Sequence, residues 1–362
     1  MSTKKKTAWN AGLIAALLIL LFLLEQTLPS SSMLFTVLKK GAIYALVAVS
    51  MNLLNGFTGL FSLGQAGFML LGAYTYAILT IPVESRNSVY QYFDGGIIQF
   101  TLPVPIALIA GGILAAVFAY LIGLPVLRLK SDYLAIATLG FAEIIRAVFQ
   151  WDKLGPITNG SNLLRNFPSF RSVIFPFVVS GICIALIVML INSTYGRAFK
   201  AIRDDEIAAE AMGINLAHHK RLAFVISSFF AGISGGLLAM YQTTIQASMF
   251  KSAMTYEILL IVVIGGIGSV TGSCISSFLF IACSEWWLRF LDNENLYIGG
   301  FHVPLLRPGF RKVVFAIVIM AVVLFYRQGI MGTKEFSIEG IFNFFKRKSS
   351  GKKEKKGGTS HE

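Results

Sequence analysis

The sequence predicts an all-α, polytopic integral membrane protein with about ten transmembrane helices and an inverted-repeat-like core. Only 14% of the 362 residues are charged and 55% are hydrophobic, with a mean hydropathy of +0.70. Soluble domains carry about 25% charged residues. The apolar residues form continuous runs, many of them long enough to cross a bilayer as helices. Strands of a membrane barrel would instead alternate apolar and polar residues over about ten positions.

The candidate spans are apolar runs separated by polar loops. The first, Ala11–Leu28, follows Lys4–Lys6 and is not followed by a small-residue cleavage site, which favours an uncleaved span over a signal peptide. The others, in chain order, are Gly41–Leu54, Phe57–Ile81, Leu102–Leu127, Tyr133–Gln150, Val173–Ile191, Leu222–Tyr241, Ala253–Ile264, Ser269–Leu291 and Val313–Tyr326. Each run is expected to form one helix, so the ten runs predict about ten spans.

The formal net charge of +13 is concentrated near the ends of the chain. Lys346–Lys356 holds seven basic residues and one Glu, and Lys4–Lys6 adds three more. Such terminal basicity does not form a nucleic-acid-binding face, so we expect no nucleic-acid partner. The C-terminal basic segment is either a solvated, disordered tail or a tail held against anionic membrane lipid.

Basic residues also give the expected orientation, because they favour the cytoplasmic side of a membrane protein. With about ten spans and a cytoplasmic N-terminus, both termini lie inside together with Arg128, Lys130 and the long polar loop 193–221. We therefore expect a transmembrane domain, residues 1–345, followed by a basic disordered cytoplasmic tail, residues 346–362.

Glycines and small polar residues interrupt the apolar sequence between Asn52 and Phe68. Two interpretations are open: a tight helix crossing, because small residues let backbones approach closely, or a broken helix lining a translocation path, where unwound backbone is tolerated. In the second interpretation the path residues are Asn55, Gly56, Gly59, Ser62, Gly64 and Gln65. A similar run ends at Gly265-Gly266-x-Gly268, and paired glycine interruptions are typical of inverted repeats around a transport site.

The loop 193–221 contains its own short helix signal. Ile207–Met212 consists mainly of good helix formers. Asp204 or Asp205 stands where a side chain can cap the N-terminus, and Gly213 stands where a left-handed residue would end the helix. We expect a helix of about two turns outside the lipid, with Ala208, Ala211 and Met212 on one side.

Three separated motifs resemble those of branched-chain amino acid ABC-importer permeases. The first is N-G-x-x-G-L-x-S-L-G-Q-A-x-F at 55–68, followed by Gly72-Ala73-Tyr74. The second, G-L-P-V-L-R-L-K-x-D-Y-L-A-I-x-T-L-G-F at 123–141, is similar to the LivM-like subunits of that family. The third comprises R-D-D-E at 203–206 and E-A-M-G at 210–213. The resemblance covers roughly residues 41–291; the loop Pro82–Thr101 carries no substrate signature, and the basic tail lies outside the family pattern.

The resemblance implies a permease subunit that imports leucine, isoleucine or valine by alternating access in the bacterial cytoplasmic membrane. Its implied partners are a sibling permease forming a heterodimer, two ABC ATPase subunits and an extracytoplasmic substrate-binding protein. Loop 193–221 would be the cytoplasmic ATPase-coupling loop, with the residues Arg203, Asp204, Asp205, Glu206, Ala208, Glu210, Ala211, Met212 and Gly213. ATP would be bound by the partner subunits, so no cofactor, metal ion or catalytic residue is expected in this chain.

Other functions agree with parts of the sequence. A permease for urea or short amides would share the fold and the loop, and a secondary transporter would need no ATPase-coupling loop. A membrane enzyme is disfavoured, because the G-x-S-x-G match at Gly232–Gly236 lies inside an apolar run with no triad partners and equally reads as G-x-x-x-G helix packing. The chain has no phosphate-binding loop sequence, and its three cysteines have no metal-ligand spacing.

Overall fold

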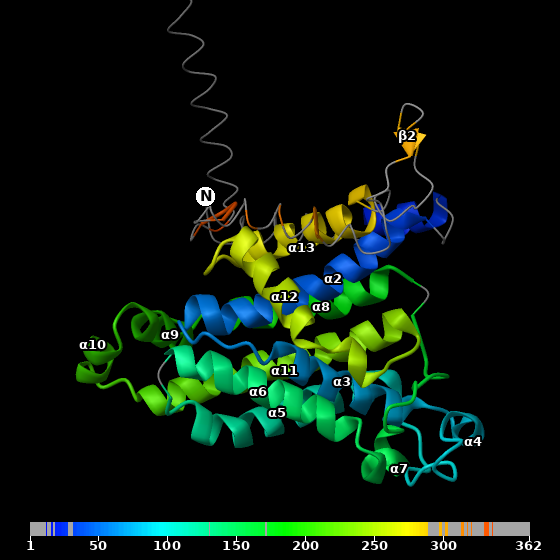
Figure 1. Cartoon of the computed structure of the whole chain (residues 1–362). Helices are drawn as coiled ribbons and strands as arrows, with labels where there is room; N and C mark the ends of the chain where they lie inside the picture. Colours follow the sequence, from blue (N-terminus) through cyan, green and yellow to red (C-terminus); the bar gives the residue numbers. More distant parts are fainter. Residues whose placement is uncertain are drawn as a thin grey trace, which may run out of the picture.

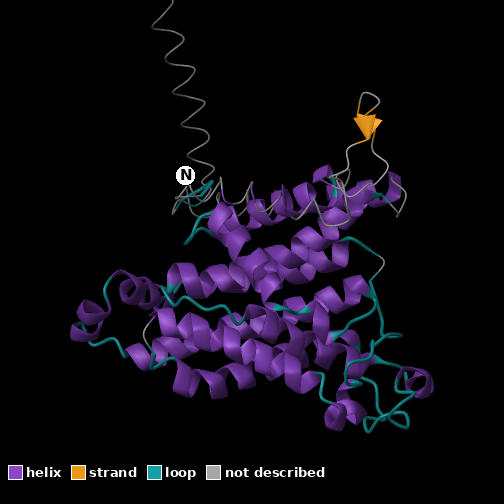
Figure 2. Cartoon of the chain, in the orientation of Figure 1, coloured by secondary structure: helices purple, strands orange, loops and turns teal. Residues whose placement is uncertain are grey.

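The computed structural model describes residues 32–288 except Lys130 and Arg171, residues 19–27, and the shorter stretches 12, 16, 297–298, 301–302, 313–314, 317, 320, 329–332 and 335. Every long element in these ranges is a helix (Figures 1 and 2). The described strands are β1, Tyr297–Ile298, and β2, Phe301–His302, which pair as a small antiparallel hairpin. The all-α class predicted from the sequence is therefore confirmed.

The longer helices run side by side along a common direction, with α9 and α10 at one end of the bundle and α4 and α7 at the other (Figure 1). Their bounds are α2, Met33–Asn52; α3, Gln65–Thr80; α5, Val104–Val126; α6, Ser131–Phe149; α8, Ile174–Asn192; α9, Thr194–Asp204; α10, Glu206–Ala211; α11, Leu216–Gln242; α12, Ser252–Gly265; and α13, Val270–Glu285. The short elements are the π-helical turn η1, Leu53–Phe57, the helices α4, Arg86–Val89, and α7, Gly155–Thr158, and the 3-10 turns η2, Val83–Ser85, η3, Asp152–Leu154, and η4, Ala247–Met249.

Several of these helices can cross a membrane. Among the described residues, Met33–Phe57, α5, α8 and α11 are long and apolar enough, and the pair Tyr133–Phe149 and Asp152–Thr158, bent by 62°, makes a fifth if counted as one span. The apolar helices α12 and α13 are shorter. This agrees with a multi-pass membrane protein. Residues 12, 16 and 19–27 of the predicted first span are described and helical, whereas most of the last span and all of the basic tail lie outside the described residues, so the number of spans stays a prediction.

Two span boundaries predicted from hydropathy are wrong. The run from Phe57 to Ile81 is not one helix, because α3 begins only at Gln65 and residues 58–64 have no regular structure. Helix α2 begins at Met33 rather than Gly41, so it includes lysines that the apolar count rejected. The Lys40 ammonium donates to the Glu285 carboxylate on α13 at 2.6 Å. A long basic side chain can enter a membrane helix near its end when it has such a partner.

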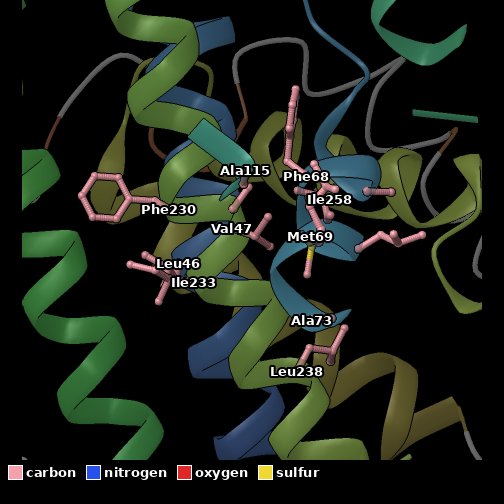
Figure 3. Close-up of a cluster of buried hydrophobic side chains, with 14 of the residues drawn as sticks. Leu46, Val47, Phe68, Met69, Ala73, Ala115, Phe230, Ile233, Leu238 and Ile258 are labelled. Atoms are coloured by element: carbon pink, nitrogen blue, oxygen red, sulfur yellow. The ribbon is translucent and has the colours of Figure 1, made fainter. Parts of the chain in front are cut away.

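The core of the bundle forms where α3, α5 and α11 cross. Figure 3 shows Met69 and Ala73 of α3, Ala115 of α5 and Ile233 and Leu238 of α11 gathered there, with side chains from α2 and α12 beside them. A Cβ added at Gly72 would run into the backbone of Gly232, and one added at Gly111 would lie 2.9 Å from the carbonyl oxygen of Gly72. Three helix backbones therefore touch through three glycines, as small-residue membrane packing requires.

The helix crossing also shows which interpretation of the G-x-S-x-G match at Gly232–Gly236 is correct. Ser234 is fully buried in the middle of α11, where its hydroxyl donates to the carbonyl oxygen of Ile43 at 3.0 Å. A Cβ at Gly236 would lie 2.6 Å from Leu108 of α5. The motif is a helix-packing face, and no strand-to-helix elbow is present at this site.

At the opposite end of the bundle from α10, one buried arginine holds the loop after α3. Arg86 is 1% exposed. Its Nη2 donates to the carbonyl oxygens of Ile78 and Ile81 at 3.0 and 3.2 Å, and to that of Phe100 at 2.9 Å. Because the last carbonyls of a helix lack partners and carry partial negative charge, a cation there both pairs and stabilises them.

Candidate functional site

The first part of the candidate site is a break between α2 and α3, residues 53–64. The chain leaves α2 through the π-helical turn η1 and then runs without regular structure to Gln65. Local bonds satisfy it: the Thr58 hydroxyl donates to the Leu53 carbonyl at 3.0 Å, and the Asn55 side-chain oxygen accepts from the Ser62 amide at 3.1 Å. Broken helices with internally satisfied backbone occur in membrane proteins where they line a path or pack within protein.

A second break, residues 266–269, separates α12 from α13. Gly266 and Gly268 have φ of +115° and +91°. The turn is closed by a segment from much later in the chain. Ile330 and Met331 donate their amides to the carbonyl oxygens of Ile264 and Gly265 at 2.7 and 3.2 Å, and the Glu335 carboxylate accepts from the amides of Val270 and Thr271 at 2.7 and 3.1 Å. That carboxylate supplies the negative charge that a helix N-terminus favours.

Asn52 joins the two breaks. Its side-chain amide, fully buried, donates to the Ser269 carbonyl at 2.9 Å and to the Ser273 hydroxyl at 2.8 Å, and its oxygen accepts from the Gly268 amide at 2.8 Å. The side-chain nitrogen and oxygen of Asn52 thus both form hydrogen bonds with residues at the α12–α13 break or in the first turn of α13. The two glycine-interrupted runs noted in the sequence therefore lie in direct contact. Asn52 is absent from the predicted path residues, and a buried amide immediately before a glycine-rich break was the signal for it.

The predicted path residues differ in how deeply they are buried. Gly56, Ser62, Gly64 and Gln65 are buried, Asn55 is half-buried and Gly59 is exposed. The Gln65 side chain donates to the Ser227 hydroxyl on α11 at 2.9 Å. A Cβ at Gly64 would lie 3.2 Å from the Thr138 carbonyl oxygen on α6. At these buried positions the structure shows close helix contact, which was the alternative interpretation, and their role in lining a path stays a prediction.

The coupling loop folds into α9, α10 and the first turns of α11. Helix α9 buries Gly196, Phe199 and Ile202 against the bundle. Asp205 caps α10 by accepting from the amides of Ile207 and Ala208 at 2.9 and 3.1 Å. The predicted short helix and its aspartate cap are therefore confirmed.

The C-terminus of α10 is equally well defined. Gly213 has φ of +84°, and its amide donates to Glu210 at 2.9 Å while the Ile214 amide donates to Ala209 at 3.1 Å. These two bonds form the double cap that ends many helices on a left-handed glycine. The Lys220 ammonium on α11 donates to the Glu206 carboxylate at 2.6 Å. Capped at both ends and tied to α11, α10 is a rigid element.

Helix α10 lies at one end of the bundle (Figure 1) and exposes apolar side chains. Ile207 is 82% exposed and Met212 is 83% exposed. Ala208, Ala211 and Glu210 are also exposed, whereas Ala209 packs inward. Exposed apolar side chains of this kind are available for contact with another protein or a membrane surface. Ile207 is a further exposed residue that was not among the predicted ones.

Arg203 differs from the other coupling-loop residues. Its Nη1 donates to the carbonyl oxygen of Gly56 at 3.1 Å. Although Arg203 is exposed, its guanidinium therefore reaches the α2–α3 break. The structure thus brings one residue predicted for coupling into contact with one predicted for the path.

Comparisons with known proteins agree with this architecture. A family model described as branched-chain amino acid transport system / permease component matches residues 33–326. The high-affinity branched-chain amino acid transport system permease protein LivM of Escherichia coli K12 is 32% identical over 295 residues, covering 72% of this chain and 65% of that protein. The probable branched-chain amino acid transport permease protein LivM of Methanocaldococcus jannaschii is 24% identical over 310 residues, covering 79% and 89%.

The similarity extends to the LivH type of subunit. The high-affinity branched-chain amino acid transport system permease protein LivH of Escherichia coli K12 is 22% identical over 300 residues, covering 78% of this chain and 94% of that protein. The match spans 65% of the length of the LivM proteins of Escherichia coli and Salmonella typhimurium. No solved structure matches the chain.

Proposed function

The chain belongs to the family of branched-chain amino acid transport permeases, and from this premise we propose that it is the transmembrane permease subunit of an ATP-driven importer. One structural observation carries the proposal. Helix α10 is a short, doubly capped helix outside the bundle that exposes Ile207 and Met212. Such a helix suits docking into a groove of a soluble subunit that drives transport from one side of the membrane.

The proposed cargo is leucine, isoleucine or valine. The support is the names of the relatives, which are permease proteins of branched-chain amino acid transport systems. A related importer for urea or short amides is the second cargo class, because it would share the fold and the coupling loop. Competition for uptake distinguishes the two classes, as described below.

The proposed assembly contains a sibling permease, two ABC ATPase subunits and an extracytoplasmic substrate-binding protein in the bacterial cytoplasmic membrane. The ATPase subunits bind ATP. This chain supplies the translocation path and the contact through which the ATPase subunits move it. Alternating access requires the path to open to one side at a time. The two joined breaks, at 53–64 and 266–269, are the proposed moving parts, because unwound backbone reorients more easily than a continuous helix.

Reconstitution tests this proposal. Co-expressed with these partners, the chain should co-purify with them, and proteoliposomes should accumulate radiolabelled leucine only when ATP and the binding protein are present. Excess isoleucine or valine should compete, whereas urea and acetamide should not. The isolated chain should hydrolyse no ATP, because it lacks a phosphate-binding loop. ATP turnover by the purified chain alone, or ATP-independent uptake driven by an ion gradient, would contradict the subunit assignment.

A further inference from the structure

We propose that Arg203 is the positioning residue through which movement of α10 reaches both helix breaks. This inference rests on the proposed function and adds to it a route inside the chain. Arg203 is the penultimate residue of α9, immediately before the corner that leads into α10. Among the described residues of the coupling loop, Arg203 is the one whose described contacts reach both the α2–α3 break and the α12–α13 break.

The contact with the α2–α3 break has a polar part and a packing part. The Arg203 guanidinium donates through Nη1 to the Gly56 carbonyl, near the end of the π-helical turn η1. The backbone of Gly59 packs against the side-chain stem. A Cβ added at Gly59 would lie 3.0 Å from Cγ of Arg203 and 3.2 Å from its Cα. A shift of Arg203 therefore displaces this break directly, because no space separates them.

The same guanidinium reaches the α12–α13 break. A Cβ added at Gly268 would lie 3.4 Å from Nη1 of Arg203 and 3.7 Å from the Gly56 carbonyl oxygen. The Gly268 amide is also bonded to Asn52 at 2.8 Å. Asn52 thus bonds Gly268 while the Arg203 guanidinium lies beside it, so movement of Arg203 bears on both breaks.

The two aspartates that follow Arg203 have different contacts: Asp204 orients the Arg203 side chain, and Asp205 caps α10. The Asp204 carboxylate accepts from Nε and Nη2 at 3.0 and 2.9 Å, so it holds the plane of the guanidinium with Nη1 directed at Gly56. The next residue, Asp205, caps α10. Three consecutive residues therefore have three functions: Arg203 contacts the breaks, Asp204 orients it and Asp205 begins the exposed helix.

Two further ties make α10 move as one body. Its first residue, Glu206, pairs with Lys220 on α11, and its C-terminal double cap fixes the turn at Gly213. These bonds join α10 to α9 at the Arg203–Asp205 corner and to α11 at Lys220. A displacement applied at Met212 therefore reaches α9 through that corner as well as α11. Lysine cannot reproduce this geometry, because an ammonium lacks the planar fork that binds Asp204 and Gly56 at once.

The test compares Arg203→Met, Arg203→Lys and a matched control, Arg197→Met, in the complete reconstituted transporter. Arg197 lies on the same helix and is exposed. Each variant is measured for assembly with the ATPase subunits, ATP turnover and leucine uptake. In Arg203→Met, assembly and ATP turnover should persist while uptake per ATP hydrolysed falls by about tenfold, the effect of losing a hydrogen bond from a charged donor.

The variants separate a positioning role from a structural one. Arg203→Lys should recover part of the uptake per ATP, because it keeps the charge and the packed stem, and Arg197→Met should match the unsubstituted protein. An unchanged ratio in Arg203→Met, an equal fall in Arg197→Met, or loss of assembly in Arg203→Met would each overturn the inference. Failure of the proposed function would look different, because the unsubstituted transporter would then show no ATP-dependent uptake.

Discussion

Replacing Gly72 with valine should leave almost no folded protein in the membrane. At this position α3 touches α11 backbone to backbone, so any side chain at Gly72 collides with the main chain of Gly232. Overpacking a core typically costs about 1–3 kcal/mol because side chains can shift. Here the obstacle is backbone, and Gly111 of α5 contacts the same point. The cost should therefore exceed that range.

The matched control is a glycine on a free helix face. Gly181 of α8 is exposed, and a Cβ added there would have no atom within 4 Å. Gly181→Val should accumulate and unfold like the unsubstituted protein, whereas Gly72→Val should be lost or aggregated in fluorescence-detected size-exclusion chromatography of membrane extracts. Equal recovery of the two variants would mean that the helix crossing at Gly72 is not as close as described.

Replacing Gly213 with valine should have the second-largest effect, this time on transport rather than on folding. Gly213 has φ of +84°, a conformation that costs an L-residue about 1–2 kcal/mol and a β-branched residue more. No atom lies within 4 Å of an added Cβ, so no collision with the bundle is expected. The strain falls on the double cap of α10, and unwinding this six-residue helix removes the rigid element.

The expected result is normal permease level in the membrane with uptake reduced by about tenfold or more. Gly213→Asn is the matched control, because asparagine tolerates the left-handed conformation at a helix C-terminus. It should retain most of the uptake. If Gly213→Val and Gly213→Asn were equally active in the leucine uptake assay, the left-handed cap would not matter for coupling.

The sequence was sufficient to predict most of the spanning helices. Helix α5 was expected at Leu102–Leu127 and is found at Val104–Val126, and α8 was expected at Val173–Ile191 and is found at Ile174–Asn192. Both are continuous apolar runs whose ends coincide with polar residues or proline. The short helix α10 was also predictable, because Asp205 and Gly213 act locally through their own neighbouring backbone.

The α2–α3 break illustrates what hydropathy does not distinguish. The residues from Thr58 to Gly64 include three large apolar side chains and no charge, yet they have no regular structure, and part of their backbone bonds to a side chain of another helix. Leu63, for example, donates its amide to the Thr138 hydroxyl of α6. A partner that lies far along the chain leaves no trace in a local pattern.

The same reason explains why the contacts of two residues were not predicted from the sequence, although a local signal marked each of them. Asn52 bonds to residues more than 200 positions away, and Arg203 bonds to Gly56, which precedes it by 147 positions. The R-D-D-E motif at 203–206 predicted a coupling role for Arg203. Its actual contact depends on how α9 packs on the bundle, which buries Phe199 and Ile202 and so sets the direction of the neighbouring side chain.

The central claim is that α10 contacts an ATP-hydrolysing subunit. A photo-cross-linking amino acid at Ala211, in cells that also express the partner subunits, tests this contact directly. The same amino acid at Tyr92 is the control, because Tyr92 is 75% exposed and follows α4, which lies at the opposite end of the bundle from α10 (Figure 1). Irradiation should join the Ala211 variant, and not the Tyr92 variant, to an ATPase subunit identified by mass spectrometry. Cross-links from Ala211 only to lipid, or to the same proteins as from Tyr92, would contradict the claim.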